Sequence, residues 1–193
     1  MRCRVETGMK RFAYIVLCSV TILFFITQNA QGLPAQDVQF LIDRQYFSAV
    51  KRLIDGARHS VQVMMFEACY YHKHTDSATN QLIDALIEAK KRGLTVDVIL
   101  EINKHNERTT TRNLEAGTVL KKAGICVFVD KDTVTTHTKL LIIDKKIVII
   151  GSTNWTFSAL ARNHEISAVI YSEESADVLQ GFFEKVKKEG KKL

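Results

Sequence analysis

The sequence predicts an α/β fold, an α/β/α sandwich in which helices flank a mixed β-sheet. Three observations lead to this fold class. Short apolar segments alternate with longer amphipathic segments between residues 61 and 129, a later pair of apolar segments surrounds a polar turn, and a further amphipathic segment closes the pattern. The 193 residues, 46% of them hydrophobic, suit one globular domain rather than two.

Residues 1–32 have the pattern of a secretory signal peptide. Lys10 and Arg11 precede an apolar run over 12–26, and small residues follow it. A membrane span needs about 20 apolar residues, so an uncleaved N-terminal anchor is the less favoured alternative. We therefore expect a single exported domain over 33–193, periplasmic or secreted, or membrane-anchored if the segment is retained.

The first half of the domain is expected to alternate between helices and strands. Residues 80–92 form the clearest helix, because apolar side chains recur at helical spacing, basic residues fill the last turn and Gly93 follows. The other expected elements are a helix with its break over 37–55, strands over 61–66 and 94–100, a helix over 111–123, and a strand over 125–129.

The second half changes to an antiparallel pattern. Apolar residues 138–143 and 147–150 surround a polar turn at 144–146, which predicts a β-hairpin. A strand over 165–171 and a closing helix over 175–188 follow, and the last lysines are expected to form a solvated tail.

Polar side chains gather where these antiparallel strands begin or end. His137 and Lys139 are two residues apart, as are Ser152 and Asn154, so each pair lies on one face of its strand. Asn163 and Glu165 have the same spacing, and Gly151 would let the backbone approach a ligand closely. These residue types can hold phosphoryl oxygens, attack phosphorus and move protons. The pattern therefore predicts a phosphate-handling site.

These residues also carry a family resemblance. His137 and Lys139, then Asp144, then Gly151-Ser152-Thr153-Asn154 resemble the HxKx4D…GSxN motif of the phospholipase D superfamily. Asn163-His164-Glu165 resembles that family's accessory acid, and the resemblance extends over about residues 38–188. It implies the same phospholipase D-like α/β/α sandwich.

The resemblance implies a mechanism without a metal or other cofactor. One motif histidine attacks the phosphodiester to form a phosphohistidine, a second protonates the leaving oxygen, and water resolves the intermediate. On this analogy His137 is nucleophile or acid, Lys139 and Asn154 bind phosphate, Ser152 assists in binding substrate, and Glu165 orients imidazole.

Asp144 belongs to the motif and is grouped with the catalytic residues, but its position predicts another role. It lies an odd number of residues from His137 and within the hairpin turn, so a continuous strand would direct it away from the site. We expect it to brace the hairpin or a partner.

The chain has a single motif, because none of its other histidines is followed two residues later by lysine. Two-histidine chemistry therefore needs a second copy of the chain, as implied by the resemblance to small single-motif bacterial endonucleases, which are homodimers with one composite site. Trp155 and Phe157 are candidate interface contacts, with a place in the core as the equal alternative.

The leading hypothesis is a metal-independent phosphodiesterase that hydrolyses DNA or RNA as a non-specific endonuclease. Its support is basic and aromatic residues in the loops over 69–76, 101–110 and 130–136. The formal net charge of +6 does not by itself identify a nucleic-acid binder. The alternatives are a phospholipase D acting on phosphatidylcholine-type membrane phospholipids and a non-catalytic phosphate-binding protein.

The two cysteines of the domain, Cys69 and Cys126, are expected to be small buried side chains, with a disulfide as the alternative. No zinc-binding spacing is present, and His72 and His74 are expected in an exposed loop.

Overall fold

The structure is a computed structural model that describes residues 32–131 and 133–193. The predicted signal segment falls, apart from Gly32, outside these residues. Within the described ranges, no helix is both long enough and apolar enough to cross a membrane.

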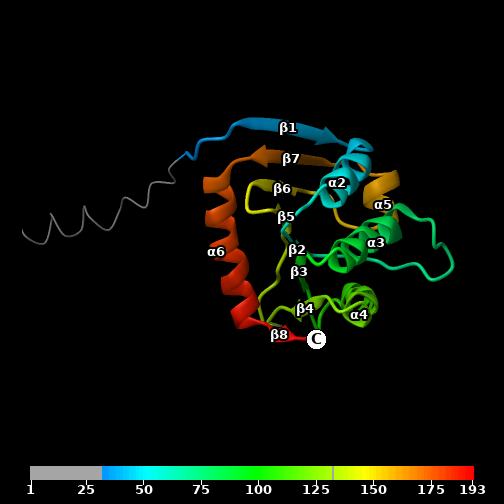
Figure 1. Cartoon of the computed structure of the whole chain (residues 1–193). Helices are drawn as coiled ribbons and strands as arrows, with labels where there is room; N and C mark the ends of the chain where they lie inside the picture. The colour runs from blue at the N-terminus through cyan, green and yellow to red at the C-terminus, as the bar shows by residue number, and fades with distance from the viewer. Residues whose placement is uncertain (1–31, 132) are drawn as a thin grey trace, which may run out of the picture. The chain divides into compact units, whose positions relative to one another are not determined.

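A single eight-stranded sheet forms the centre of residues 34–193, in the order β1-β7-β6-β5-β2-β3-β4-β8 (Figure 1). β2, β3 and β4 are parallel, and every other neighbouring pair is antiparallel, so the sheet is mixed as predicted. The strands are β1 (Asp37–Ile42), β2 (Ser60–Met65), β3 (Thr95–Leu100), β4 (Cys126–Val129), β5 (Lys139–Ile143), β6 (Ile147–Gly151), β7 (Ile166–Tyr171) and β8 (Lys191–Lys192).

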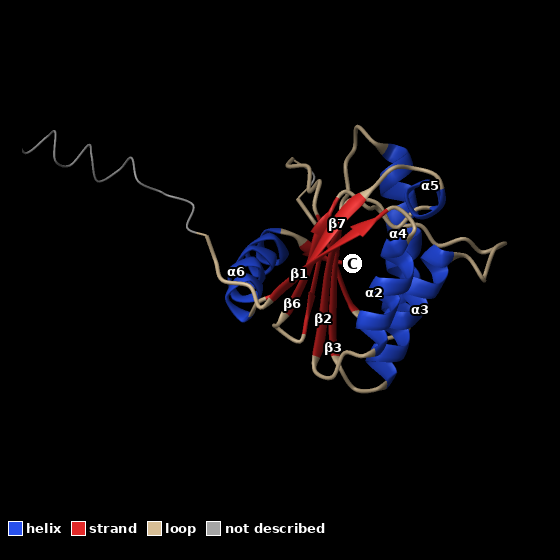
Figure 2. Cartoon of the chain, turned by 90° about the horizontal axis from the view of Figure 1, so that it is seen from above, coloured by secondary structure: helices blue, strands red, loops and turns tan. Residues whose placement is uncertain are grey.

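Helices cover both faces of the sheet, which confirms the α/β/α sandwich. In the view of Figure 2, α6 lies on one side and the other helices lie on the opposite side. The helices are α2 (Gln45–Asp55), α3 (Ala78–Lys91), α4 (Glu107–Lys122), α5 (Phe157–Ala161) and α6 (Glu173–Glu189).

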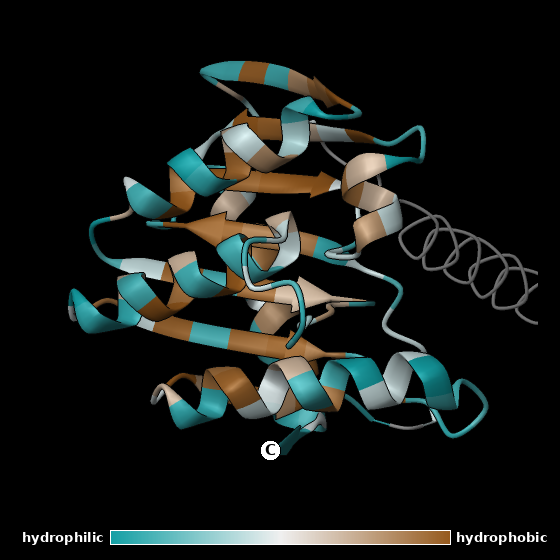
Figure 3. Ribbon diagram, turned by 90° about the vertical axis from the view of Figure 1, so that its right-hand side faces the viewer, coloured by the Kyte–Doolittle hydropathy of each residue, from teal (hydrophilic) through white to brown (hydrophobic). Residues whose placement is uncertain are grey.

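The core consists of two apolar layers, one on each face of the sheet. The larger layer packs α2, α3 and α4 against the strands, and the smaller packs α6 through Ala176 and Phe183 against residues such as Leu140. The strands are accordingly the most hydrophobic parts of the ribbon in Figure 3, whereas hydrophobic and hydrophilic residues alternate along the helices.

The expected helix over 37–55 is wrong in its first half, where the structure has strand β1. Val38, Phe40 and Ile42 alternate along the chain with Gln39 and Leu41, and β1 pairs antiparallel with β7. Val38, Leu41 and Ile42 also fit a helical spacing, so the pairing with β7 decided between helix and strand.

Other differences lie at the ends of elements. α4 begins at Glu107 rather than 111 because the Asn106 side chain accepts the backbone N–H of Thr109 and caps the helix. The terminal lysines form β8 instead of a solvated tail, since β8 pairs with β4. The short helix α5 was not expected.

Candidate active site at the ends of β5, β6 and β7

The predicted site residues gather at one edge of the sheet. β5 begins at Lys139, β6 ends at Gly151 and β7 begins at Ile166, and the antiparallel pairings place these three ends beside one another. The carboxyl ends of β2, β3 and β4 lie at the same edge, because β2 is antiparallel to β5. The sequence prediction of one shared location is confirmed by this topology.

His137 and Lys139 form a close pair. The Lys139 ammonium lies 3.3 Å from Nε2 of His137 and donates a 2.9 Å hydrogen bond to the His137 carbonyl oxygen. Lys139 is buried, whereas His137 is exposed. A buried ammonium next to an exposed imidazole can hold a phosphoryl oxygen while the ring nitrogen reaches the phosphorus.

The environment lowers the pKa of both groups. Burial lowers the pKa of His137 below its ordinary value, and the adjacent Lys139 ammonium lowers it further. Burial also lowers the pKa of Lys139, while the carboxylates of Glu165 and Glu67 act in the opposite direction. An unprotonated His137 is the form that a nucleophile requires.

Phe66 supports this pair, and sequence reasoning missed it. Its ring centroid lies 4.4 Å from that of His137 at a tilted angle, and the Lys139 ammonium lies 4.7 Å from the Phe66 centroid. The only sequence signal was its position, directly after β2, because ligand sites collect beyond the carboxyl ends of strands.

Ser152, Asn163 and Glu165 form a second cluster. The Ser152 hydroxyl donates a short hydrogen bond to one Glu165 oxygen, and the Asn163 amide donates to the other at 3.0 Å. Both oxygens of Glu165 therefore have partners within the chain. No described carboxylate contacts the His137 ring in a single chain, so the orienting role of Glu165 stays a prediction.

Asp43 fixes the loop that carries Glu165. One Asp43 oxygen accepts the backbone N–H of Glu165 at 2.8 Å, and the other lies 3.2 Å from His164. Asp43 itself has a φ of 51°, which ends β1 and turns the chain into α2. Asp43 lies more than a hundred positions before Glu165 in the sequence, so no local pattern indicated this contact.

Asn154 is half-buried and lines a cleft that Phe66 also lines. Its carboxamide oxygen is buried without a hydrogen-bond partner in the described part of the chain. A rotation exchanges the two ends of a carboxamide, so the NH₂ group can occupy the same place. The residue can thus donate to a ligand oxygen, as predicted for a phosphate contact.

Gly151 is required by its neighbours in the sheet. A side chain at this position would collide with Ser167 and with the carbonyl oxygen of Ile166, so the glycine is required by the neighbouring strand β7. The close approach that the structure shows is therefore within the sheet, and a close approach to a ligand stays a prediction.

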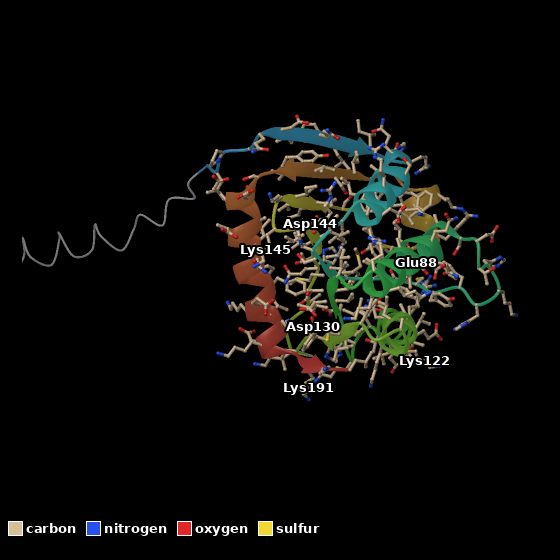
Figure 4. The ribbon with its side chains drawn as sticks, in the orientation of Figure 1. Glu88, Lys122, Asp130, Asp144, Lys145 and Lys191 are labelled. Atoms are coloured by element: carbon tan, nitrogen blue, oxygen red, sulfur yellow. The ribbon has the colours of Figure 1, made fainter. Side chains whose placement is uncertain are left out.

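Asp144 braces the loop before β2. Its two oxygens accept the backbone N–H groups of Arg58, His59 and Ser60 at 2.9, 2.7 and 2.9 Å. Burial opposes ionisation of Asp144, but the three donors outweigh it and lower the pKa of its carboxyl. Figure 4 shows Asp144 next to Lys145, at the hairpin turn where φ is 52° and 55°.

Trp155 does not form a surface contact. It is 1% exposed, and its indole N–H donates to the Tyr46 hydroxyl at 3.2 Å. Phe157, in contrast, is 49% exposed, and the guanidinium of Arg162 lies 4.9 Å from its ring centroid. Of the two candidate interface residues, only Phe157 remains available.

A cleft of about 1100 Å³ adjoins the site on the side of α3, α4 and α5. Its lining includes Asn154 and Phe66, the acidic Asp76, and five basic or aromatic side chains: His74, Arg108, Arg112, Tyr71 and Phe157. Glu67 also lines it and forms a 2.6 Å ion pair with Arg112. The cleft can therefore accept a chain that carries both negative charge and planar groups.

Cys69 is buried and Cys126 is half-buried, and neither forms a disulfide. Within the described residues, no group of three His, Cys, Asp or Glu side chains is arranged to hold a metal ion. His72 and His74 lie in an exposed loop, as predicted.

Solved structures share this fold. Nuc from Salmonella typhimurium, a phospholipase D family member, superposes with a TM-score of 0.70 at 24% identity, over 81% of this chain and 97% of that chain. NucT from Helicobacter pylori gives 0.61 at 20% identity, over 81% of this chain and 100% of that chain. At this level of identity the likeness shows the fold alone.

The sequence comparisons show the family. Residues 50–187 match the family model described as cardiolipin synthase, PLD-like domain, and the chain therefore belongs to this phospholipase D-like family. It is 35% identical over 125 residues to a phospholipase D of Rickettsia bellii (64% of this chain, 55% of the relative). It is 30% identical over 139 residues to a mitochondrial cardiolipin hydrolase of Canis lupus familiaris (72% and 49%). The chain thus spans about half the length of these relatives.

Proposed function

We propose that this protein is a metal-independent phosphodiesterase that hydrolyses DNA or RNA without sequence specificity. The observation that carries the choice of substrate is the cleft beside Asn154, whose lining combines Arg108, Arg112 and His74 with the half-buried ring of Tyr71 and the exposed ring of Phe157. Repeated phosphates and stackable bases match this combination of cations and rings.

The proposed reaction starts at His137. Its neutral imidazole attacks the phosphorus, the leaving oxygen departs, and a phosphohistidine forms. The Lys139 ammonium, 3.3 Å from the attacking nitrogen, and the amide of Asn154 hold the non-bridging oxygens as charge develops on them. A water molecule then attacks the phosphohistidine and regenerates the imidazole.

The leaving oxygen needs a proton from an acid on the opposite side of the phosphorus. The chain carries one histidine of the motif, so we propose that a second copy supplies the other in a homodimer with a composite site. The carboxylate of Glu165 would then face the two-fold axis together with His137.

An exposed apolar patch on the outer strands fits this dimer. Phe40, Ile42, Ile150 and Ile166 are 64%, 55%, 38% and 55% exposed, and their register places them on the face that α6 covers elsewhere. The patch begins at Ile166, directly after Glu165, so a partner seated on it would adjoin the site. We propose this outer-strand patch, in place of Trp155, as part of the interface.

A phospholipase D acting on membrane phospholipid is the second candidate. Val134, in the loop before His137, is 62% exposed, and Phe157 lies at the cleft, so two apolar side chains could enter a lipid surface. The names of the curated relatives support this candidate. We also propose that the domain is exported by its N-terminal segment, which fractionation of cells would test.

The deciding experiment is a substrate panel in excess chelator. Purified protein is incubated with plasmid DNA, single-stranded RNA, and phosphatidylcholine or cardiolipin vesicles, beside a His137→Ala control. Cleavage of nucleic acid that His137→Ala lacks supports the nuclease. Cleavage of lipid alone supports the second candidate, and phosphate-ester binding without turnover supports a non-catalytic protein.

A matched pair of variants on α4 tests the cleft. Arg108→Gln removes a charge from the cleft, whereas Lys122→Gln removes one from the far end of the same helix, labelled in Figure 4. For a nuclease, Arg108→Gln should raise KM and lower the slope of log KM against log salt by about one, and Lys122→Gln should do neither. Equal effects of the two variants would contradict the proposed path of the substrate.

A further inference from the structure

Two carboxyl groups are buried together beneath the loop that leads to His137. Glu101 directly follows β3 and is fully buried, and Asp130 directly follows β4 and is 2% exposed. Figure 4 labels Asp130 near the lower end of the sheet. Neither residue belongs to the motif, and the proposed reaction uses neither.

Each carboxyl group holds a backbone N–H with one of its oxygens. Glu101 accepts the N–H of Thr136, the residue before His137, and Asp130 accepts the N–H of Ile102 at 2.8 Å. The remaining oxygen of each group is buried and has no other partner in the described ranges. Leu100 and Val129 are paired neighbours of the parallel strands β3 and β4, so the next residues, Glu101 and Asp130, leave the sheet side by side. One proton shared between them would satisfy both oxygens.

The surroundings keep that proton in place near neutral pH. Burial raises the pKa of Glu101 to about 8, and Asp130 raises it as hydrogen-bond partner and as like charge. The N–H of Thr136 and the side chain of Asn103 lower the pKa of Glu101, but their effect is smaller than the increase. Asp130 is the titratable group that faces Glu101, so ionisation of both would place two negative charges side by side.

We propose that the Glu101–Asp130 acid pair is a positioning device that holds the segment before His137 against the ends of β3 and β4, through one shared proton. The inference rests on the proposed reaction at His137. While the proton is shared, Thr136 is tied to Glu101 and the pair is compact. Loss of the proton drives the two carboxylates apart and loosens the tie one residue away from the nucleophile.

A neighbouring amide links this device to the ring that packs on His137. Asn113 of α4 is fully buried, and its NH₂ group donates to the carbonyl oxygens of Phe66 and Glu101, both at 2.8 Å. The backbones of Phe66 and Glu101 are therefore fixed to one side chain. His137 and the ring it contacts are positioned from the same point.

The first arm of the test measures stability and needs no turnover. Native Glu101 keeps its proton up to about pH 8, whereas unfolded glutamate loses it near the ordinary 4.5, so unfolding releases a proton between these values. The urea midpoint of wild-type protein should therefore fall as the pH rises from about 4.5 to about 8. Glu101→Gln keeps a donor toward Asp130 and an acceptor toward Thr136 but cannot ionise. The urea midpoint of Glu101→Gln should decline less than that of wild type. The difference between the two midpoints should therefore grow as the pH rises from about 4.5 to about 8.

The second arm measures kcat per folded molecule. Glu101→Leu removes the tie to Thr136 and should lower kcat at least about tenfold with a smaller change in KM, and Glu101→Gln should restore it. Above pH 8 the ratio of kcat for Glu101→Gln to that of wild type should rise. Glu88→Gln, an exposed glutamate on α3, is the matched control and should change neither arm.

The arms separate the two proposals. Equal pH dependence of stability in wild type and Glu101→Gln would overturn the shared proton whatever the activity. If that arm succeeds but Glu101→Leu has the wild-type kcat, the pair is structural and the positioning role is wrong. Absence of turnover on every substrate would instead contradict the proposed function and leave the stability arm as the measure of the acid pair.

Discussion

At the scale of single residues, the site depends on two neighbouring side chains that differ in burial. The imidazole of His137 is exposed, and the ammonium of Lys139, 3.3 Å away, is buried. The exposed ring contributes little packing, so its removal should affect chemistry and leave the fold intact. The ammonium stabilises charge that develops only during the reaction, and its effect should appear in kcat.

His137→Ala should therefore lower kcat/KM at least about a thousandfold, and Lys139→Ala and Asn154→Ala about a hundredfold or more. The urea midpoint of His137→Ala should match that of wild type. His59→Ala, an exposed histidine at the other end of the sheet, serves as control and should keep full activity. Substantial turnover by folded His137→Ala would exclude His137 as nucleophile.

The pKa of His137 gives a second prediction at this scale. Since burial and then Lys139 lower it, the ring should titrate below 6.5 in an NMR experiment, and the acid limb of the pH–rate profile should lie there too. Lys139→Met removes the neighbouring charge, so the midpoint of His137 should move upward. A downward movement would mean that the ammonium does not act on the ring through its charge.

At the scale of elements, the hairpin β5–β6 is attached to the loop before β2 by one carboxylate. Asp144→Asn loses the charge and at least one good acceptor site for the three N–H groups, which should lower the free energy of unfolding by about 1–3 kcal/mol. Denaturant unfolding measures this loss, and kcat per folded molecule should stay near that of wild type. A stable but inactive Asp144→Asn protein would place Asp144 in the chemistry instead.

The pH dependence of this loss has a fixed sign. The pKa of Asp144 is lowered in the folded state, so its contribution is complete above the ordinary value of 3.8 and disappears as the pH falls below it. The difference in stability between wild type and Asp144→Asn should therefore shrink under acidic conditions. If the difference in stability between the two proteins stayed constant down to the lowest accessible pH, the charge of Asp144 would not be what stabilises the loop before β2.

At the scale of the whole molecule, the central question is how many copies make one site. If both His137 residues of a dimer serve one phosphorus, an equimolar, re-equilibrated mixture of wild type and His137→Ala should retain about a quarter of the wild-type activity, since mixed dimers are inactive. Independent sites would retain about half.

The outer-strand patch offers a direct test of the interface. Ile166→Glu places a charge on it and should yield inactive monomers in sedimentation experiments. Leu114→Glu changes an exposed apolar residue on α4 and is the control that should remain dimeric. A dimeric and active Ile166→Glu protein would exclude the patch as the interface.

Turnover should also survive dialysis against chelator. The resemblance to the family implies that histidine and lysine supply the chemistry without a metal, so kcat should be unchanged with and without a divalent ion. A rate that collapses in chelator and returns with one metal would show that the inferred mechanism is wrong.

The sequence by itself determined the elements whose signals are local. Helix α3 followed from apolar periodicity and Gly93, and the β5–β6 hairpin followed from a polar turn between apolar runs, since such signals act over a few residues. The spacing of His137, Lys139 and Asn154 also predicted one location, because side chains two apart share a face and the strand ends meet. The odd offset of Asp144 predicted its turn away from the site.

Tertiary structure decided what depends on distant partners. β1 became a strand because β7 offered an edge to pair with, and Gly151 proved necessary for that same neighbour, β7. Trp155 became core because Tyr46 of α2 accepts its indole N–H. Glu101 and Asp130 share a proton only because β3 and β4 end side by side. A linear pattern records spacing along the chain, whereas burial and pairing are set by which strands become neighbours.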